Sequence, residues 1–295
     1  MSRLVGGGGE LPERDRLFIT LKISLALIVK LRKMENLRHA FKTALMLVLI
    51  SGAVAGCVTT VTGPYTKKAS EEKAAQQYVQ LGLAYFQQGD MESALLKLQR
   101  ALEIKPDNAE ALAAMGLVYQ RQKEPFLAEK QFKSALRSDA NFTRGRTYYA
   151  AYLYEQGRFK EAVEQFEKAS SDVNYEGRAQ IFSNIGLIRL RLGDIDQSIK
   201  AYEKSLTLRH GQPNAVLALS SLYFEKRELA KADKLYGAFW ESVRRGGASH
   251  SPASLALGIK IAREKKDLNE EASLMLLLKN MFPNSAEYKT MKGSS

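Results

Sequence analysis

The sequence contains few residues of the types that usually carry out chemistry in proteins. Its 295 residues include one cysteine, Cys57, and three histidines, His39, His210 and His250, which lie far apart along the chain. A single cysteine excludes an intramolecular disulfide and a cysteine-based zinc site, and the histidines fall in no metal-ligand spacing. We therefore predict no metal site and no cofactor, and the thiol of Cys57 is the nucleophile of interest.

The motifs of common enzymes are absent from the sequence. There is no Gly-x-Ser-x-Gly, no phosphate loop, no His-Glu-x-x-His and no dinucleotide fingerprint. Acidic residues such as Glu161, Glu164 and Glu167 recur at three-residue steps beside Lys160 and Lys168, which is typical of a solvated helix face. We therefore predict no catalytic residues, and we expect a binding protein.

Cys57 ends a short apolar segment that has the layout of a secretory signal. From Met34, a basic stretch with Arg38 and Lys42 precedes the apolar run, and small residues lead directly into the cysteine. Val54-Ala55-Gly56-Cys57 resembles a bacterial lipobox. In that scheme the thiol forms a thioether with a diacylglycerol, the signal is cut before the cysteine, and the new N-terminus is acylated.

The lipobox resemblance implies a lipid anchor on the periplasmic face of the outer membrane. The residue after Cys57 is Val58 and not the aspartate that resembles an inner-membrane retention signal. The alternative is that Cys57 is a buried core thiol near an uncleaved membrane helix. The apolar run is short for that, because a spanning helix needs about 20 apolar residues.

Residues 1–33 precede this signal and are harder to assign. A start at Met1 would make the basic region of the signal too long, so we predict that Met34 is the true start and that 1–33 is an upstream extension. The alternative is an additional membrane-associating helix. We predict a signal peptide over 34–56 and a flexible tether over 57–70, because the latter is short, polar and without helical periodicity.

The net charge is positive but is not concentrated in one region. Lys and Arg number 44 against 32 Asp and Glu, giving +12, and residues 1–56 hold 9 basic and 4 acidic residues, which leaves +7 for the remainder. The basic residues form no blocks with interleaved aromatics. The sequence therefore predicts no nucleic-acid partner.

The rest of the chain repeats a pattern about every 34 residues. The first copy consists of Tyr78, Leu81, Gly82, Tyr85, Ala94, Leu98, Ala101 and Pro106. Further copies follow around Gly116, Ala150, Gly186 and Ser220, and a looser sixth has Leu257, Gly258, Ile261, Ala272, Leu276 and Pro283. This pattern resembles the tetratricopeptide repeat (TPR), in which two helices form each unit.

We therefore predict an all-α, right-handed superhelical solenoid of about six TPR units over 71–290, with a tail at 291–295. The small residues let two helix backbones approach closely, and Gly89, Gly157 and Gly193 supply the turns between them. Arg189 stands where a large apolar residue is usual, which indicates either a locally weaker core or a salt bridge. The insertion Gly246–Ser251 predicts a flexible loop before the sixth unit.

A partner-binding groove is expected on the inner side of the solenoid, next to the core stripe of each first helix. The candidate groove residues are Val79, Leu83, Phe86, Leu117, Arg121, Tyr154, Leu187, Leu190 and Phe224. The same positions include Leu217, Leu255 and Ile259, and Arg191 joins Arg121 on the rim. The alternative is that some of these side chains, the leucines above all, pack between neighbouring first helices.

The lipobox, the short tether and six TPR units together resemble the PilF/PilW family of type IV pilus biogenesis lipoproteins. The most specific element is the end of the chain, Met275 to Tyr288, with Phe-Pro-Asn-Ser-Ala-Glu-Tyr. The resemblance implies a pilotin that uses the lipoprotein-sorting machinery and helps subunits of the type IV pilus secretin to reach the outer membrane and multimerise. The alternative is a general periplasmic TPR scaffold in envelope biogenesis.

Overall fold

The structure is a computed structural model that describes residues 64–293, with side chains from residue 70 onward. The predicted extension (1–33), the signal (34–56) and Cys57 with the tether up to residue 63 lie outside the described residues. The regular elements of the described part are helices, and it contains no strand. Their bounds are α2 (Pro64–Gln88), α3 (Met91–Ile104), α4 (Ala109–Arg121), α5 (Pro125–Ser138), α6 (Thr143–Glu155), α7 (Phe159–Ser170), α8 (Arg178–Arg191), α9 (Ile195–Leu208), α10 (Pro213–Glu225), α11 (Leu229–Arg244), α12 (Pro252–Lys265), α13 (Leu268–Met281) and α14 (Ala286–Gly293).

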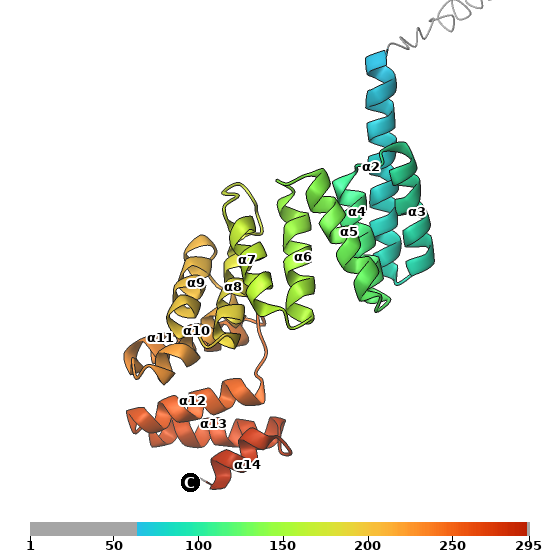
Figure 1. Cartoon of the computed structure of the whole chain (residues 1–295). Coiled ribbons are helices and arrows are strands. Elements are labelled where there is room, and N and C mark those ends of the chain that lie inside the picture. The colour runs from blue at the N-terminus through green and yellow to red at the C-terminus, as the bar shows by residue number, and fades with distance from the viewer. Residues whose placement is uncertain (1–63, 294–295) are drawn as a thin grey trace, which may run out of the picture. The chain divides into compact units, whose positions relative to one another are not determined.

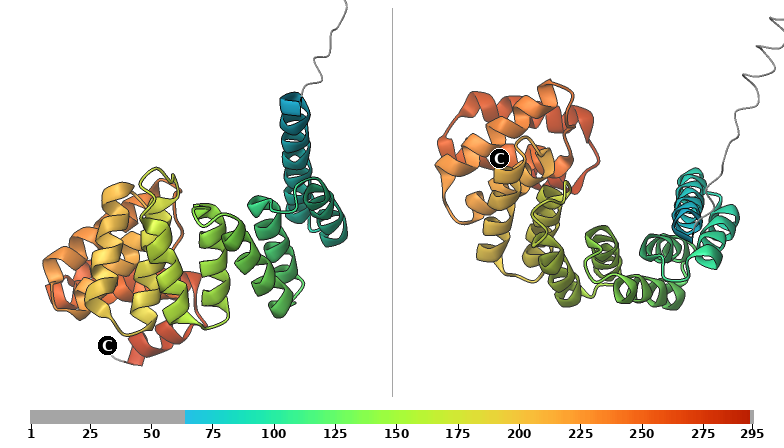
Figure 2. Two further views of the ribbon diagram at one scale, coloured as in Figure 1. Left: turned by 45° about the horizontal axis from the view of Figure 1, so that its top comes forward. Right: turned by 90° about the horizontal axis from the view of Figure 1, so that it is seen from above.

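The helices from α2 to α13 form six consecutive pairs, one for each predicted repeat (Figure 1). Each pair packs against the next, so that the pairs stack side by side from α2 to α13 (Figure 2). First helices also contact one another, since α4 packs against both α2 and α6, and α10 against α12. We call the surface of the first helices α2, α4, α6, α8, α10 and α12 the inner wall. The predicted all-α TPR solenoid is confirmed.

Small residues permit the close packing within each pair. A Cβ atom added at Gly116 of α4 would lie 2.6 Å from a ring carbon of Phe132 of α5, and one at Gly82 would lie 2.7 Å from Leu98. Both distances are far below van der Waals contact, so each large side chain of the second helix rests on the bare backbone of the first. The predicted role of these glycines is confirmed.

The turn between the two helices of a pair needs one residue in the left-handed conformation. Gly89, Gly157 and Gly193 adopt it, with φ of +85°, +72° and +78°. The other three repeats place Lys123, Arg227 and Lys266 at this position, with φ of +62°, +62° and +59°. The turn is therefore dictated by the packing of the pair, even where the residue disfavours it.

The hydrophobic core runs through the stack. In the first and sixth repeats, some of the residues predicted to be in this core are exposed. Leu81 is 42% exposed, whereas Met115, at the same position in the second repeat, is 5% exposed. Met115 is covered by the preceding helix pair, and no earlier described pair covers Leu81.

In the sixth repeat Leu276 is 57% exposed and Ala272 is also exposed, while Leu274 and Leu278 are buried. The predicted register of α13 is therefore wrong. The buried residues lie two positions further along the helix, where Leu274 and Leu278 pack in the same core cluster as Leu255 and Ile259 of α12.

Two predicted boundaries also change. Helix α2 begins at Pro64, so residues 64–70 are helical and not part of a flexible tether. Proline at a first helical position is favourable because its missing N–H has no helical partner there. At the other end, Met291 belongs to α14 and is 6% exposed, so the predicted tail over 291–295 begins too early.

We predict that Lys266→Gly stabilises the protein. Lysine in the left-handed conformation is strained, and glycine relieves the strain at a smaller entropic cost, so the free energy of unfolding should rise by about 0.5–1 kcal/mol. Urea unfolding followed by circular dichroism measures the change. Gly157→Ala, which introduces the same strain in the third repeat, should lower the free energy of unfolding, and an increase there would contradict the argument.

Candidate functional site

The inner wall contains a cavity of about 620 Å³ where the first three repeats meet. It lies at the C-terminal ends of α2, α4 and α6, next to the start of α5. The residues that line it are Phe86, Leu117, Gln120, Arg121, Lys123, Pro125, Tyr152, Glu155 and Gln156. Three of the predicted groove residues, Phe86, Leu117 and Arg121, therefore share one cavity.

An aromatic ring and a guanidinium group lie together in this cavity. The Cζ atom of Arg121 is 5.0 Å from the centroid of the Phe86 ring, which is cation–π geometry. Phe86 is half-buried and packs on the core of the first two repeats, while Arg121 is exposed. The cavity thus combines an apolar anchor point with a positive charge.

The polar side of the cavity is formed by Gln120 and Glu155. Gln120 Nε2 donates a hydrogen bond of 2.6 Å to Glu155 Oε2. Within the described residues, Gln120 Oε1 is buried and accepts no hydrogen bond. A buried acceptor without a donor destabilises a protein, and a donor group of a bound partner would remove that cost.

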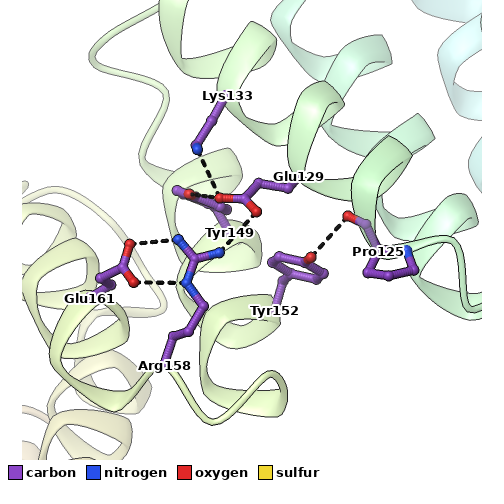
Figure 3. Close-up of polar contacts among 7 residues, drawn as sticks. All are labelled: Pro125, Glu129, Lys133, Tyr149, Tyr152, Arg158 and Glu161. Carbon is purple, nitrogen blue, oxygen red and sulfur yellow. Dashed lines mark hydrogen bonds and ion pairs between the residues drawn. The ribbon is translucent and has the colours of Figure 1, made fainter.

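The side of the cavity formed by Pro125 and Tyr152 is held in place by hydrogen bonding and ring packing. The hydroxyl of Tyr152 donates a hydrogen bond of 2.9 Å to the carbonyl oxygen of Pro125 (Figure 3). The Tyr152 ring lies 5.5 Å from Phe132 and 6.3 Å from Tyr149, measured between centroids. The third repeat is thereby fixed against the start of α5.

Glu129 of α5 connects the second and third repeats through several charged groups (Figure 3). It accepts hydrogen bonds of 2.9 Å from both the Tyr149 hydroxyl and Arg158 Nη1, and Lys133 Nζ lies 2.8 Å away. Arg158 also donates to both carboxylate oxygens of Glu161, at 2.6 and 2.7 Å. Burial raises the pKa of Glu129, but the hydrogen bonds from Lys133, Arg158 and Tyr149 outweigh it and lower the pKa to about 2.

Several predicted groove residues lie outside the first cavity. Leu83, Leu187 and Leu190 are half-buried against the core clusters. Tyr154 is also half-buried, and its ring lies 5.5 Å from that of Phe159. Phe224 lines a second cavity between the fifth and sixth repeats.

The prediction for Val79 is wrong, since its side chain is fully buried. It packs in the core with residues of α3 and α4, because α4 lies against this face of α2. Leu255 and Ile259 are fully buried in the sixth repeat for a related reason, since α10, α13 and α14 all contact α12. The alternative of packing between helices therefore holds at these three positions.

Sequence reasoning missed the residues at the turn side of the cavity, namely Gln120, Lys123, Pro125, Tyr152, Glu155 and Gln156. Most of them lie in the last turn of a first helix or in the turn that follows it. Aligning these last turns across repeats would have found them.

The salt bridge considered for Arg189 exists, since its guanidinium contacts Glu167 at 2.5 Å and Asp194 at 3.4 Å.

The described residues contain no group of His, Cys, Asp and Glu that would hold a metal ion. Among residues 64–293, no helix has both the length and the apolar character needed to cross a membrane.

Comparisons with known proteins agree with the repeat pattern. A model described as "TPR repeat" matches residues 82–123, and models described as "Tetratricopeptide repeat" match 113–174 and 179–209. The chain is 36% identical over 247 residues to the type IV pilus assembly protein PilF of Pseudomonas aeruginosa, covering 83% of this chain and 96% of PilF.

The fold is similar to that of solved structures of the same kind. The structure of Pseudomonas aeruginosa PilF matches with a TM-score of 0.71, over 77% of this chain and 100% of that chain. The crystal structure of PilW, a widely conserved type IV pilus biogenesis factor, matches with a TM-score of 0.61 at 23% identity, over 74% of this chain and 97% of that chain.

We predict that Glu129→Gln destabilises the protein in a pH-dependent way. The folded pKa of about 2 lies below the ordinary value of 4.5, so the stabilisation is present above pH 4.5 and is lost as the pH falls towards 2. At pH 7 the variant should lose about 1–2 kcal/mol, allowing for partial exposure. Its difference from the wild type should shrink between pH 5 and pH 3 in urea unfolding.

Glu164→Gln is the matched control for this prediction. The Glu164 carboxylate pairs with Lys168 at 2.6 Å, and both side chains are more than half exposed, at 58% and 54%. Its replacement should cost less than about 0.5 kcal/mol at any pH. An equal loss in the two variants would contradict a special role for Glu129.

Proposed function

Since this chain belongs to the PilF family of TPR proteins of type IV pilus biogenesis, we propose that it is a pilotin for the type IV pilus secretin. In this role it binds secretin subunits through the inner wall and supports their localisation and multimerisation in the outer membrane. The observation that carries the proposal is the cavity in which Phe86, Leu117 and Arg121 meet.

The chemistry of this cavity fits recognition of a protein segment. Half-buried Phe86 and Leu117 provide an apolar surface on which an apolar side chain of a partner can pack. Arg121 and Lys123 on the rim of the cavity attract acidic side chains. Gln120 Oε1 offers an acceptor to a backbone or side-chain donor of that segment. We infer a partner segment with an apolar side chain next to an acidic residue.

The lipid anchor is the second part of the proposal. The lipobox that ends at Cys57 supports attachment to the periplasmic face of the outer membrane by way of the lipoprotein-sorting machinery. Two or three acyl chains on one residue give firm membrane binding, because each buried methylene contributes about 0.8 kcal/mol. The anchor would concentrate the TPR domain where the secretin ring forms.

We predict that Phe86→Ala abolishes support of secretin assembly while the protein stays folded and lipidated. Truncating a large aromatic anchor costs about 2 kcal/mol or more of binding free energy. Secretin multimers resistant to detergent, together with twitching motility, provide the readout in cells that produce the variant in place of the native protein.

Phe182→Ala is the matched control, because Phe182 is also a half-buried aromatic on a first helix, with Arg178 Cζ 5.6 Å from its ring centroid. It lines neither described cavity, so multimers should persist in this variant. Normal multimers in cells with Phe86→Ala would contradict the proposal and favour a general scaffold.

We predict that Cys57→Ser removes the protein from the outer membrane without unfolding it. Serine lacks the thiol needed for the thioether, and the repeat core is unchanged. Membrane flotation and metabolic labelling with a radioactive fatty acid measure the effect. A serine variant that still floats with outer membranes would show that the protein is retained there by something other than a lipid.

A further inference from the structure

A second cavity, of about 500 Å³, lies between the fifth and sixth repeats and shares no lining residue with the first. Helices α10, α12 and α14 form it together with the turn that follows α10. The lining residues are Ser221, Phe224, Glu225, Arg227, Ala253, Ala256, Leu257, Lys260, Glu264 and Glu287.

The apolar part of this cavity shares one position with that of the first. Phe224 follows the small residue Ser220 by four positions, as Phe86 follows Gly82, so the two rings occupy the same place in their repeats. Phe224 is half-buried, and the small residues Ala253 and Ala256 line the same cavity. The ring and the small side chains leave room for one apolar side chain of a ligand.

The charges around the second cavity differ from those around the first. Its lining contains three carboxylates, Glu225, Glu264 and Glu287, and two cations, Arg227 and Lys260. Arg227 is paired with Glu264, since its Nη1 atom lies 3.0 Å from Glu264 Oε1. Glu225 and Glu287 therefore outnumber the remaining cation, Lys260. The first cavity has the opposite balance, with Arg121 and Lys123 against Glu155.

The terminal helix α14, which lies outside the repeat pattern, supplies one of the two carboxylates. Arg263 Nη2 of α12 donates a hydrogen bond of 3.2 Å to the carbonyl oxygen of Met291, whose side chain is 6% exposed and packs in the core. These contacts hold α14 against α12 and bring Glu287 to the rim.

The opposite end of α12 is fixed as well. Ser251 and Ser254 form a reciprocal capping box at its start, beside Ala253. Helix α12, which lines the cavity, is therefore held in place at both of its ends.

We propose that this cavity is a second protein-docking site, which binds a segment with an apolar side chain next to lysine or arginine. The apolar side chain packs on Phe224 and the cation lies between Glu225 and Glu287. These two carboxylates attract a cation although the chain from Cys57 onward has a net charge of +7, which repels cationic ligands. This site is independent of the secretin role, because it involves different residues and a ligand of opposite charge.

The test measures the binding of two synthetic peptides to the full lipidated chain in a non-ionic detergent. Fluorescein-labelled Gly-Ser-Leu-Lys-Leu-Lys-Ser-Gly is compared with the same peptide in which glutamate replaces both lysines, by fluorescence anisotropy at 50 mM salt. We expect the lysine peptide to lose about tenfold in affinity when Glu225→Gln and Glu287→Gln are combined, and to lose affinity in Phe224→Ala.

The control is Phe86→Ala, which should leave the affinity for the lysine peptide unchanged because it alters only the first cavity. Combined Glu225→Lys and Glu287→Lys should instead favour the glutamate peptide, and these exposed or half-buried rim positions can be changed without touching the core. Unchanged binding in the double glutamine variant, or an equal loss in Phe86→Ala, would overturn the proposal. Thermal unfolding by circular dichroism verifies that each variant is folded.

Discussion

Each helix pair in this protein has apolar surface that only the neighbouring pair can cover. The clearest evidence is one repeated position on the first helix, where Met115, Tyr149 and Ile185 are each 5% exposed while Leu81 is 42% exposed. Because burial of apolar area is the main stabilising contribution in folding, the repeats must stack in a continuous series. The stacking in turn aligns the first helices, so the inner wall is a by-product of core formation.

Both cavities are lined by the last turn of a first helix and by the left-handed residue of a turn, Lys123 after α4 in the first cavity and Arg227 after α10 in the second. Each also has an aromatic side chain in its lining, Phe86 of α2 or Phe224 of α10. Exposed charges contribute little to folding, so the balance of charge around the two cavities can differ without a change of fold.

The polar network around Glu129 has a different role from the surface ion pairs of the solenoid. Its carboxylate is 22% exposed and is contacted by three donors from α5, α6 and the turn after α6. A partly buried carboxylate that lost these donors would be strongly destabilising, so the network disfavours any sliding of the third repeat on the second. The relative position of Arg121 in the second repeat and Tyr152 in the third depends on this register.

The sequence by itself determined the repeat architecture, because the small residues and left-handed turns have local causes that recur at a fixed period. Gly82, Gly116, Gly89 and Gly193 act within one helix pair, and so their roles could be predicted. The prediction that Cys57 is lipidated likewise rests only on the residues immediately before it. The tertiary structure decided which positions of the first helices are accessible, since the burial of Val79 and the exposure of Leu81 depend on whether a neighbouring helix covers them. The cavities and the position of Glu287 on α14 depend on contacts beyond a single repeat, and a periodic pattern read one repeat at a time contains no information about such contacts.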